Sequence, residues 1–410
     1  MIMKRSLVKS LAMVAATAVA AMGFTGCGAS TSTKATNGTT SENASSDTAT
    51  NDTAEASEDT TTTASGDVYK IGGMGPLTGD AASYGISVKQ GAEIAINEIN
   101  AAGGVNGHNL ELVFEDDECD EEKAISAYNK VMDEGVIAIL GAVTSGCSVA
   151  VAGESVNDGI LQITPSGSAL ECTDGDNAFR ICFTDPLQGE TMAKYISEQG
   201  YKNVAIIYDA ASDYSKGITD AFVAEAGNLG LGIADQESFN SGDVDFKTQL
   251  TKIKDSGADC IFLPLYYAEV GYISEQAATL GINLPYFGSD GWDGIIAQLN
   301  GDTTNIEGAT FLTPFVATDE AENIKAFVGA YEAAYLATPD QFAADSYDGV
   351  YAIKAAIEQC GDDVTNENLI AAMTKISING LTGDMTFTAE GEPNKSAKVA
   401  VIEKGQYIAK

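Results

Sequence analysis

Two short segments rich in glycine and hydroxyl side chains each lie at the end of an apolar run. They are GAVTSG (141–146) and TPSGS (164–168). Neither has the Gly-Lys-Ser/Thr ending that holds the phosphates of a nucleotide. A hydroxyl group at the start of a helix, with the free backbone N–H groups around it, suits a smaller anion such as a carboxylate. We therefore expect Ser145 and the 164–168 segment to bind one carboxylate group, although an isolated serine in such a place is often only a helix N-cap.

A carboxylate stands in a comparable place in the second half of the chain. FGSDGW (287–292) carries Asp290 in a loop, and Tyr266 follows the apolar run 260–264. Hydroxyl donors on one side and a carboxylate on the other suit a ligand with separated charges, such as an amino-acid zwitterion. Tyr84, Tyr214 and Tyr266 are candidates to line the pocket, although packing is the more common role of a single tyrosine.

The sequence evidence for an enzyme is weaker than that for a binding site. Gly73 and Gly75 begin an imperfect dinucleotide fingerprint, because proline follows and the third glycine is misplaced. The only histidine, His108, lies in a turn, where a solvated side chain is the common role. The acidic run EDDECDEE (115–122) predicts the end of a strand followed by a helix N-terminus rich in acids, rather than a metal site. We therefore predict no catalytic residue, no metal and no cofactor.

Short apolar runs alternate with amphipathic stretches from Val68 onward. The secondary-structure elements that they predict must position the candidate binding residues. The alternation predicts parallel strands joined by helices, and it begins a second time after Asp185, so we expect two doubly wound α/β lobes. The C-terminal third is more helical. The predicted strands are 68–73, 110–117, 136–140, 160–164, 204–209, 231–239, 260–264, 384–388 and 397–402, and the predicted helices are one around 88–99, one ending near 133, 145–157, 188–199, 216–229, 245–256, 268–280, 319–336, 342–359 and 366–375.

Length and charge set limits on the partners. The chain has 410 residues, enough for two sizeable cores, and a formal net charge of −37. This charge argues against nucleic acid and against an anionic membrane surface as partners. An acidic surface also keeps a protein soluble, and that is the simpler explanation for most of the charge.

The N-terminus has the pattern of an export signal. Three basic residues precede an apolar stretch (11–24) that is too short to span a bilayer, and a small residue stands immediately before Cys27. This resembles the lipobox of bacterial lipoproteins, in which the cysteine is diacylated and becomes the first mature residue, although Phe24 stands where leucine is usual. A plain secretory signal is the alternative. We predict a signal peptide over 1–26 and a disordered tether over 27–66, which lacks large apolar residues.

The remaining cysteines leave the disulfide question open. Six of them permit fifteen pairings in an exported protein, and none shows the C-x-x-C spacing of a zinc or redox site. Cys260 lies inside an apolar run, where a buried free thiol is expected. The six are Cys119, Cys147, Cys172, Cys182, Cys260 and Cys360.

Taken together, several segments resemble the substrate-binding proteins of branched-chain amino acid transport systems, which are type I periplasmic-binding proteins. The resemblance covers about 68–410 and implies two lobes joined by three crossovers, with ligand held between them. It places lobe one at 67–184 with 315–384, and lobe two at 186–313 with 387–410. The segments are GPLTGDAASYG (75–85), INAAGGVNGHNLEL (99–112), GAVTSG, GILQITPSGS (159–168), FRICFTDPLQG (179–189) and YYAEVG (266–271).

The resemblance also implies roles for residues of the first lobe. Ser145 would bind the α-carboxylate of the ligand. Ser166 would offer a carbonyl oxygen to the ammonium group, and Ser168 a hydroxyl and an N–H to the carboxylate, with Gly167 between them as a further binding position. Tyr84 would line the pocket. Ser166 and Ser168 replace the alanine and threonine of the branched-chain prototypes.

In the second lobe the resemblance makes Tyr214 and Tyr266 pocket residues and gives Asp290 the ammonium group. The prototypes have glutamate at that position, so a shorter side chain must reach the same group. Asp185, at the first crossover, is a further candidate. Trp292 is expected near the cleft, where it would shape the pocket for the ligand side chain.

The function implied is that of a lipid-anchored, monomeric, extracytoplasmic receptor. It captures an amino acid, with branched aliphatic side chains favoured, and delivers it to the membrane subunits of an ABC permease. Alternatives are a sensory receptor of the same fold and a receptor for a small amide or urea. A dehydrogenase would need to bind a nicotinamide nucleotide, and a structural adhesin would need no ligand in the cleft.

Overall fold

The computed structural model describes residues 67–410. The predicted signal peptide (1–26), the lipid-attachment residue Cys27 and the tether (27–66) lie outside the described residues. Within 67–410, none of the helices combines the length and the hydrophobicity that crossing a bilayer requires.

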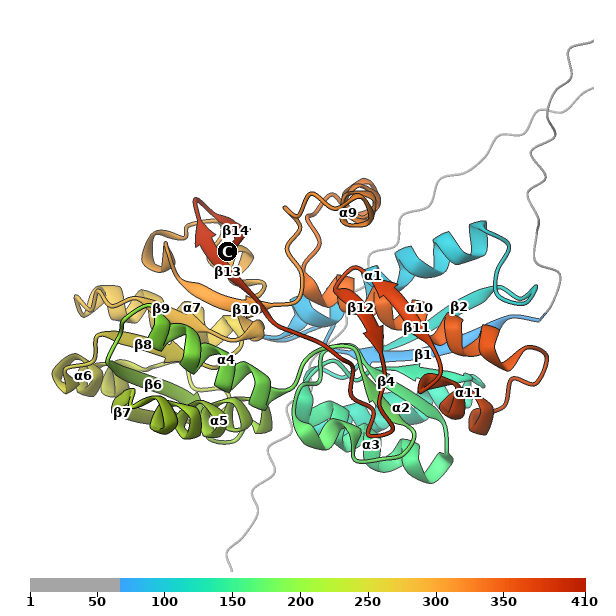
Figure 1. The fold of residues 1–410 in the computed structure, drawn as a ribbon, viewed down its shortest axis with the longest axis horizontal. Helices are drawn as coiled ribbons and strands as arrows, with labels where there is room; N and C mark the ends of the chain where they lie inside the picture. The colour runs from blue at the N-terminus through green and yellow to red at the C-terminus, as the bar shows by residue number, and fades with distance from the viewer. Residues whose placement is uncertain (1–66) are drawn as a thin grey trace, which may run out of the picture. The chain divides into compact units, whose positions relative to one another are not determined.

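The first lobe is built on a sheet of five parallel strands in the order β2-β1-β3-β4-β5 (Figure 1). The inner strands β3 and β4 are short and buried on both faces, which explains why their sequences are apolar runs. The strands are β1 (Tyr69–Gly75), β2 (Leu110–Asp116), β3 (Ala138–Leu140), β4 (Leu161–Thr164) and β5 (Ala178–Arg180).

Helices cover both faces of this sheet. One face packs against α1 (Ala82–Ala101), α10 (Gln341–Cys360) and α11 (Asn366–Met373), and the other against α2 (Glu121–Asp133) and α3 (Ser145–Asp158). The acidic run 115–122 is the end of β2 and the start of α2, as predicted, and its Asp120 caps the helix by accepting from the Lys123 N–H. Three further elements complete the lobe: α9 (Glu322–Tyr335), which packs on α1, and the hairpin of β11 (Ser377–Gly380) and β12 (Gly383–Thr386).

The second lobe is built on a sheet of seven strands in the order β14-β13-β10-β9-β8-β6-β7. Strands β6 to β10 are parallel, and β13 and β14 extend the sheet antiparallel beside β10. The strands are β6 (Asn203–Asp209), β7 (Gly232–Phe239), β8 (Cys260–Leu263), β9 (Tyr286–Gly288), β10 (Thr310–Thr313), β13 (Lys398–Glu403) and β14 (Gln406–Ala409).

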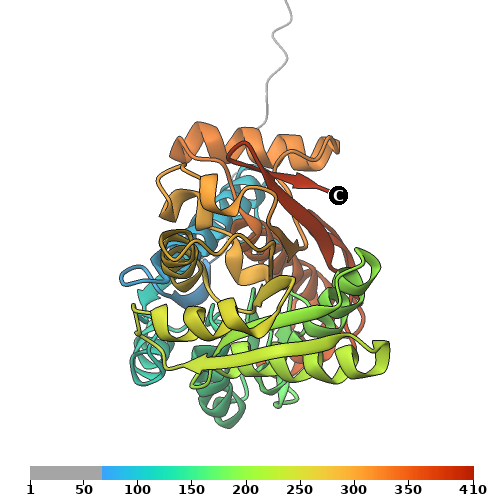
Figure 2. The ribbon, with the colours of Figure 1, turned by 90° about the vertical axis from the view of Figure 1, so that its left-hand side faces the viewer.

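Helices again lie on both faces of the sheet (Figure 2). Val204 and Ile206 pack into the core under α4 (Asp185–Glu198) and α5 (Asp213–Leu229), whereas Ala205 and Ile207 pack under the helices of the opposite face. This alternation is the two-residue period of a strand that is buried on both sides. The opposite face carries α6 (Lys247–Ser256), α7 (Tyr267–Thr279) and α8 (Ile295–Gln298). Two 3₁₀ turns of this lobe cover Asp290–Trp292 and Thr304–Ile306, and a third, Leu170–Thr173, belongs to the first lobe.

The chain passes between the lobes three times. It leaves the first lobe after β5, returns after β10 and leaves again after β12, where the last connection runs from β12 to β13 (Figure 1). The predicted fold class, two doubly wound parallel-sheet lobes joined by three crossovers, is confirmed. The prediction did not include β5, β9, β10, β11 and β14, which are only three or four residues long and so carry little periodicity.

A close helix contact in the first lobe gives a test of this packing. A Cβ atom at Gly91 of α1 would lie 2.0 Å from the Ala343 carbonyl oxygen of α10, whereas one at Gly153 of α3 would meet nothing within 4 Å. We expect Gly91→Ala to lower the free energy of unfolding by about 1–3 kcal/mol, because the helices must move apart. The matched change Gly153→Ala should raise it by about 0.5–1 kcal/mol, through helix propensity alone. Urea titration measures both, and equal effects would contradict the packing described here.

Candidate functional site

The two parallel sheets share one strand order. Counting along the chain within each lobe, both follow the order 2-1-3-4-5, with β2-β1-β3 in one and β7-β6-β8 in the other. The connections that follow the first and the third strand therefore run to opposite sides of the sheet, which leaves a crevice between these two strands. Ligands of α/β proteins bind at such a topological switch point. The predicted residues follow these strands: Tyr84 follows β1, Ser145 follows β3, Ser166, Gly167 and Ser168 follow β4, Tyr214 follows β6, Tyr266 follows β8 and Asp290 follows β9.

Ser145 begins α3, as the sequence predicted, and its hydroxyl joins two loops. Its Oγ accepts hydrogen bonds from the backbone N–H groups of Ser168 (3.1 Å) and Ala169 (3.2 Å). These N–H groups are therefore already bonded within the protein. The Ser145 hydroxyl proton is left as the group that can donate to an anion.

A buried arginine holds the loop that carries the other hydroxyl groups. The Arg180 guanidinium donates to the carbonyl oxygens of Gly167 (2.8 Å), Ala169 (2.9 Å) and Leu170 (3.1 Å), and it also bonds the Glu392 carboxylate. Its side chain is fully buried, so these bonds are strong and fix the loop from below. Arg180 was absent from the predicted site, and the sequence pattern gave no signal for it.

The serine side chains on this loop differ in what they bind. The Ser166 hydroxyl donates to the Val143 carbonyl oxygen at 2.7 Å, so it ties its loop to the segment before Ser145. Ser168 is completely buried, and its hydroxyl has no hydrogen-bond partner among the described residues. Of the two serines, Ser168 is therefore the one with an unused donor.

Asp290 and Tyr214 form a pair on the second lobe. The Tyr214 hydroxyl donates to Oδ1 of Asp290 at 2.6 Å and accepts from the Gly291 N–H at 2.9 Å. Burial raises the pKa of the Asp290 carboxyl to about 6, although the hydrogen bond from Tyr214 acts in the opposite direction. Burial also raises the pKa of Tyr214, so the tyrosine stays a neutral donor.

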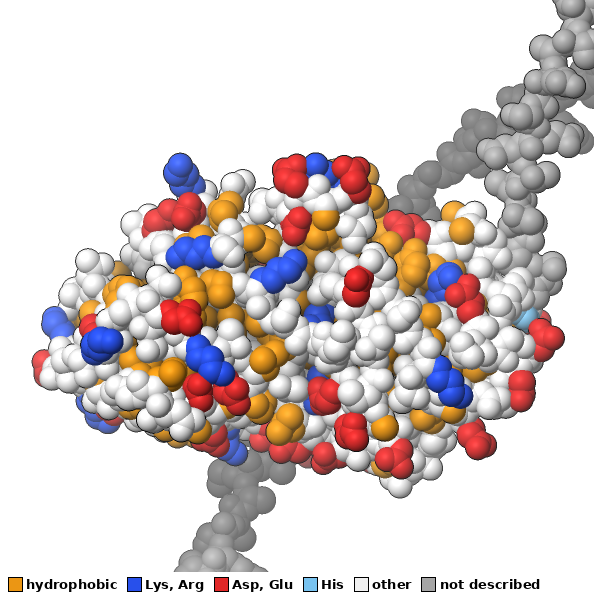
Figure 3. Space-filling model, viewed as in Figure 1, with side chains coloured by type: hydrophobic (Ala, Val, Ile, Leu, Met, Phe, Trp, Pro, Cys, Tyr) orange, Lys and Arg blue, Asp and Glu red, His pale blue; other side chains and the backbone are white. Residues whose placement is uncertain are grey.

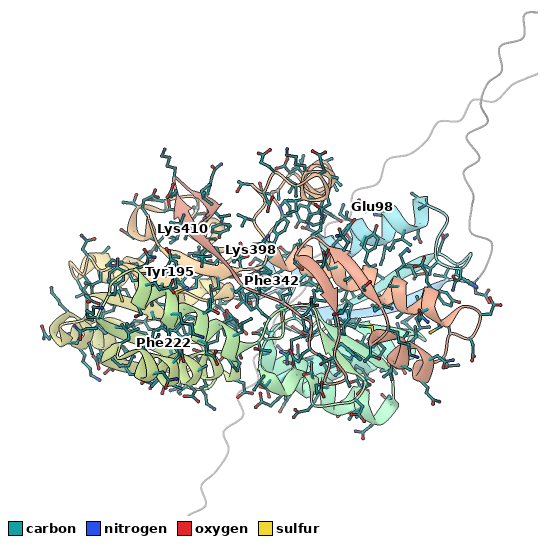
Figure 4. All side chains as sticks on the ribbon, in the orientation of Figure 1. Glu98, Tyr195, Phe222, Phe342, Lys398 and Lys410 are labelled. Atoms are coloured by element: carbon teal, nitrogen blue, oxygen red, sulfur yellow. The ribbon has the colours of Figure 1, made fainter. Side chains whose placement is uncertain are left out.

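Hydrogen bonds connect the lobes at this point. The Tyr84 hydroxyl donates to the Gly291 carbonyl oxygen at 2.5 Å, and the Gln341 side-chain amide donates to the Asp290 carbonyl oxygen at 2.5 Å. The Phe342 ring packs on the Tyr84 ring with centroids 4.2 Å apart, and Figure 4 shows Phe342 where the chain passes between the lobes. Groups from both lobes thus meet around one buried point.

The residues that meet there enclose a cavity of about 10 Å³, the space of a single water molecule. Five of the eight predicted residues line it, whereas Ser145, Gly167 and Ser168 lie outside its lining. The predicted lining residues are Tyr84, Ser166, Tyr214, Tyr266 and Asp290, and those that the sequence analysis missed are Val143, Thr144, Gly291 and Phe342. Val143 and Thr144 stand within GAVTSG and could have been included, but Phe342 is remote in sequence.

A larger cleft of about 420 Å³ adjoins the cavity and shares Thr144, Tyr214 and Tyr266 with it. Six carboxylate side chains and no lysine, arginine or histidine line this cleft. On the outer face in Figure 3, by contrast, basic side chains stand among the acidic ones. The six are Asp80, Glu118 and Glu121 of the first lobe and Asp209, Asp213 and Glu269 of the second.

Trp292 does not lie where the sequence analysis expected it, at the ligand pocket. Its side chain is completely buried in the second lobe, its ring N–H donates to the Leu263 carbonyl oxygen at 2.9 Å, and it stacks beside Phe311. It lines neither the cavity nor the cleft. Trp292 therefore supports the sheet behind Asp290 and does not shape the pocket.

The sequence analysis also considered a histidine, the cysteines and a metal site. His108 stacks on Tyr69 and bonds the Asp67 carbonyl oxygen at 2.6 Å, away from the cleft. Cys260 is a buried free thiol, as predicted, and the five other cysteines of 67–410 are free as well. Over the same residues, no cluster of histidine, cysteine and acidic side chains could hold a metal ion. The site is thus composed of hydroxyl, carboxylate and aromatic groups, which are suited to binding.

Comparison with known proteins agrees with this geometry. The profile of the periplasmic binding protein family matches residues 68–406. A Leu/Ile/Val-binding protein homolog of Brucella melitensis is 33% identical over 332 residues, which cover 78% of this chain and 88% of that protein. A Leu-, Ile-, Val-, Thr- and Ala-binding protein of Pseudomonas aeruginosa is 32% identical, with 80% of this chain and 87% of that protein covered.

Solved structures are similar over the same range. The leucine-binding protein LivK of Thermotoga maritima has a TM-score of 0.78 at 30% identity, and the comparison covers 84% of this chain and 98% of that one. LivJ of Streptococcus pneumoniae, in complex with isoleucine, has a TM-score of 0.76 at 32% identity, covering 84% of this chain and all of that one. A benzoate-bound protein of R. palustris reaches 0.77 at 22% identity, which shows a shared fold only.

The buried carboxyl groups predict how stability depends on pH. Burial is the main cause that raises the pKa of Asp290 and Asp340 to about 6, and of Asp117 and Asp345 to about 7. The folded chain therefore holds protons that the unfolded chain releases above about pH 4. We expect the free energy of unfolding to fall by several kcal/mol between pH 5 and pH 8, since one pKa unit on one group corresponds to about 1.4 kcal/mol.

Urea titrations at the two pH values and constant ionic strength measure this difference. Asp117→Asn removes one of these groups and should reduce the dependence. A chain that is more stable at pH 8 than at pH 5 would contradict the expected effect of burial on these carboxyl groups.

Proposed function

Because the chain belongs to the periplasmic binding protein family, we propose that it is an extracytoplasmic receptor that captures an amino acid between its two lobes and delivers it to an ABC permease. Branched-chain aliphatic amino acids are the favoured ligands. The relatives named for leucine, isoleucine and valine support this choice, as does the isoleucine complex of LivJ. The proposed role is binding rather than catalysis.

One observation carries the proposal: the hydroxyl-bearing loops of the first lobe and a buried carboxylate of the second lobe line the same aromatic cavity. In the proposed complex, Ser145 and Ser168 bind the α-carboxylate of the ligand, and Asp290 binds the ammonium group. Tyr84, Tyr214 and Tyr266 line the pocket, with Ser166 and Gly167 contributing backbone groups. A zwitterion would then bridge the two lobes.

Closure of the lobes follows from the same contacts. The cavity of about 10 Å³ is far smaller than an amino acid, so the flanking groups must separate for a ligand to enter. A ligand that touches both lobes favours the conformation in which they approach. Water is then excluded, and the ion pair with Asp290 gains strength in the less polar interior.

The remaining parts of the proposal rest on the sequence. A lipid on Cys27 would anchor the receptor to the outer side of the membrane, the tether 27–66 would give it reach, and it would act as a monomer. The proposed lobes are 67–184 with 315–384 and 186–313 with 387–410.

The test of this function is a thermal-shift screen of the 67–410 fragment against amino acids, small amides, urea and nicotinamide nucleotides. A ligand that binds only the folded chain stabilises it by about 2.7 kcal/mol at a hundredfold excess over Kd. We expect a clear rise in Tm with leucine, isoleucine or valine. No response to any amino acid, together with a response to an amide or a nucleotide, would reject the ligand class.

The ligand orientation has its own test. Asp290→Ala leaves a buried ammonium group without its partner, so we expect it to weaken amino acid binding by about 2–5 kcal/mol, measured by calorimetry. Asp117→Ala is the control, because Asp117 is completely buried but lines neither the cavity nor the cleft. Near-native affinity in Asp290→Ala would show that the ligand is bound the other way round.

A further inference from the structure

A second large cavity lies between the lobes, apart from the candidate amino acid site. Its volume is about 670 Å³, which is within the usual range of small-molecule pockets. None of its lining residues lines the acidic cleft or the small cavity beside that cleft. Its walls come from α1 and α9 of the first lobe, from α8 and the β13–β14 hairpin of the second, and from the second crossover after β10. In Figure 1, α9 and this hairpin stand on the same side of the molecule.

Most of the wall of this cavity is apolar. Ile86 of α1 and Ile296 of α8 contribute to it, together with Phe315 and Val316 of the second crossover. Ile86 is 40% exposed, although its side chain is large and aliphatic. Exposed apolar surface within a concave site is typical of a place that binds an apolar group.

Two carboxylates are the only charged side chains that the described residues contribute to this cavity. Asp340 comes from the first lobe, at the start of α10, and Asp293 from the second lobe. Asp340 accepts hydrogen bonds from the Ser87 hydroxyl at 2.6 Å and the Ala343 N–H at 3.0 Å. Asp293 accepts from two backbone N–H groups, at 3.0 and 3.1 Å. Neither forms a salt bridge with a basic side chain of 67–410.

The two carboxylates lie close enough to influence each other's charge. Burial is the main cause that raises the pKa of Asp293, and the neighbouring Asp340 carboxylate raises it further. Burial also raises the pKa of Asp340 to about 6. Their hydrogen bonds come from neutral donors, and a carboxylate can accept more bonds than each of them receives. A cation in the cavity would therefore stabilise the charged forms of both.

We propose that this cavity is a second ligand site, which binds an organic cation with an apolar body, such as a primary amine that carries an aromatic ring. The ammonium group lies between Asp293 and Asp340, and the apolar body packs on Ile86, Ile296 and Phe315. The site rejects simple carboxylic acids, because they would bring a third negative charge to the two carboxylates.

Three chain segments connect this cavity to the candidate amino acid site. Each segment contributes one residue to the small cavity of that site and another to the second cavity. The pairs are Tyr84 and Ser83, Asp290 and Asp293, and Phe342 and Asp340.

These shared segments predict that the two sites are coupled. Because the walls of the second cavity come from both lobes, a bound cation favours the arrangement in which the lobes are joined. It therefore raises the affinity for the amino acid, and the amino acid raises the affinity for the cation by the same factor. This coupling rests on the proposed function, whereas the second site itself does not.

Calorimetry with the full-length chain tests the site, with 2-phenylethylamine as the probe. We expect saturable binding with a Kd of about 1 mM or below. The matched probe 3-phenylpropanoate has the same ring and chain but a carboxylate in place of the ammonium group, so it should bind about tenfold more weakly or not at all. Failure of 2-phenylethylamine to bind, or equal binding of the two probes, would overturn the proposal.

A matched pair of variants locates the bound amine. Asparagine caps a helix about as well as aspartate, so Asp340→Asn keeps the cap of α10 and removes only the charge. We expect it to weaken 2-phenylethylamine binding about 10- to 100-fold. Asp120→Asn makes the same change at the cap of α2, lines none of the three cavities and should leave this binding unchanged. Equal affinity in Asp340→Asn and the wild type would reject the assigned site.

Titrations with isoleucine separate the two sites. The chain saturated with isoleucine should still bind 2-phenylethylamine, and saturating amine should lower the Kd of isoleucine about fivefold or more. Displacement of the amine by isoleucine would overturn the proposal, because the amine would then occupy the amino acid site. An unchanged isoleucine Kd would overturn the coupling. If the chain binds no amino acid, the proposed function fails, while the amine titrations and Asp340→Asn still decide the second site.

Discussion

Parallel strands place their carboxyl ends at one edge of a sheet, and the candidate site depends on this constraint in both lobes. The loops after β1, β3 and β4 meet at the switch point of one sheet, and those after β6, β8 and β9 meet at that of the other. Residues as distant as Tyr84 and Asp290 come together because the two edges face each other. Both lobes use the same strand order, but the loops of the first lobe contribute hydroxyl groups to the site and a loop of the second lobe contributes a carboxylate.

Charge is distributed unevenly around that site. The buried cations of the described structure are engaged elsewhere: Arg180 holds the hydroxyl-bearing loop from below, and Lys395 pairs with Asp345 beside the third crossover. The cleft itself is lined by acidic groups, and the buried Asp290 lines the small cavity that adjoins it. Because burial raises the pKa of Asp290, its charged form would gain stability from a cation that enters with the proposed ligand.

Contacts between the lobes explain how binding can be coupled to movement. The hydrogen bonds of Tyr84 and Gln341 to the segment around Asp290 form only when the lobes approach, and the aromatic rings of both lobes pack in the same place. Each such bond contributes modestly, about 1 kcal/mol. In the proposed mechanism, a ligand that contacts both lobes adds to these interactions and favours the arrangement in which the lobes are joined.

The sequence alone determined the alternation of strands and helices, because burial of both sheet faces leaves apolar runs between amphipathic stretches. It also determined that Ser145 would begin a helix and that Tyr214, Tyr266 and Asp290 would follow strands, since these are local properties of the chain. Only the tertiary structure decided the short strands β5, β9 and β10, which sheet neighbours stabilise more than their own pattern does. It alone brought Phe342 and Gln341 to the site from a remote helix and placed Trp292 inside the second lobe. It also left the Asp185 carboxylate without a hydrogen-bond partner among residues 67–410. Contacts between distant segments depend on how the lobes fold back on one another, and no local pattern of residues records them.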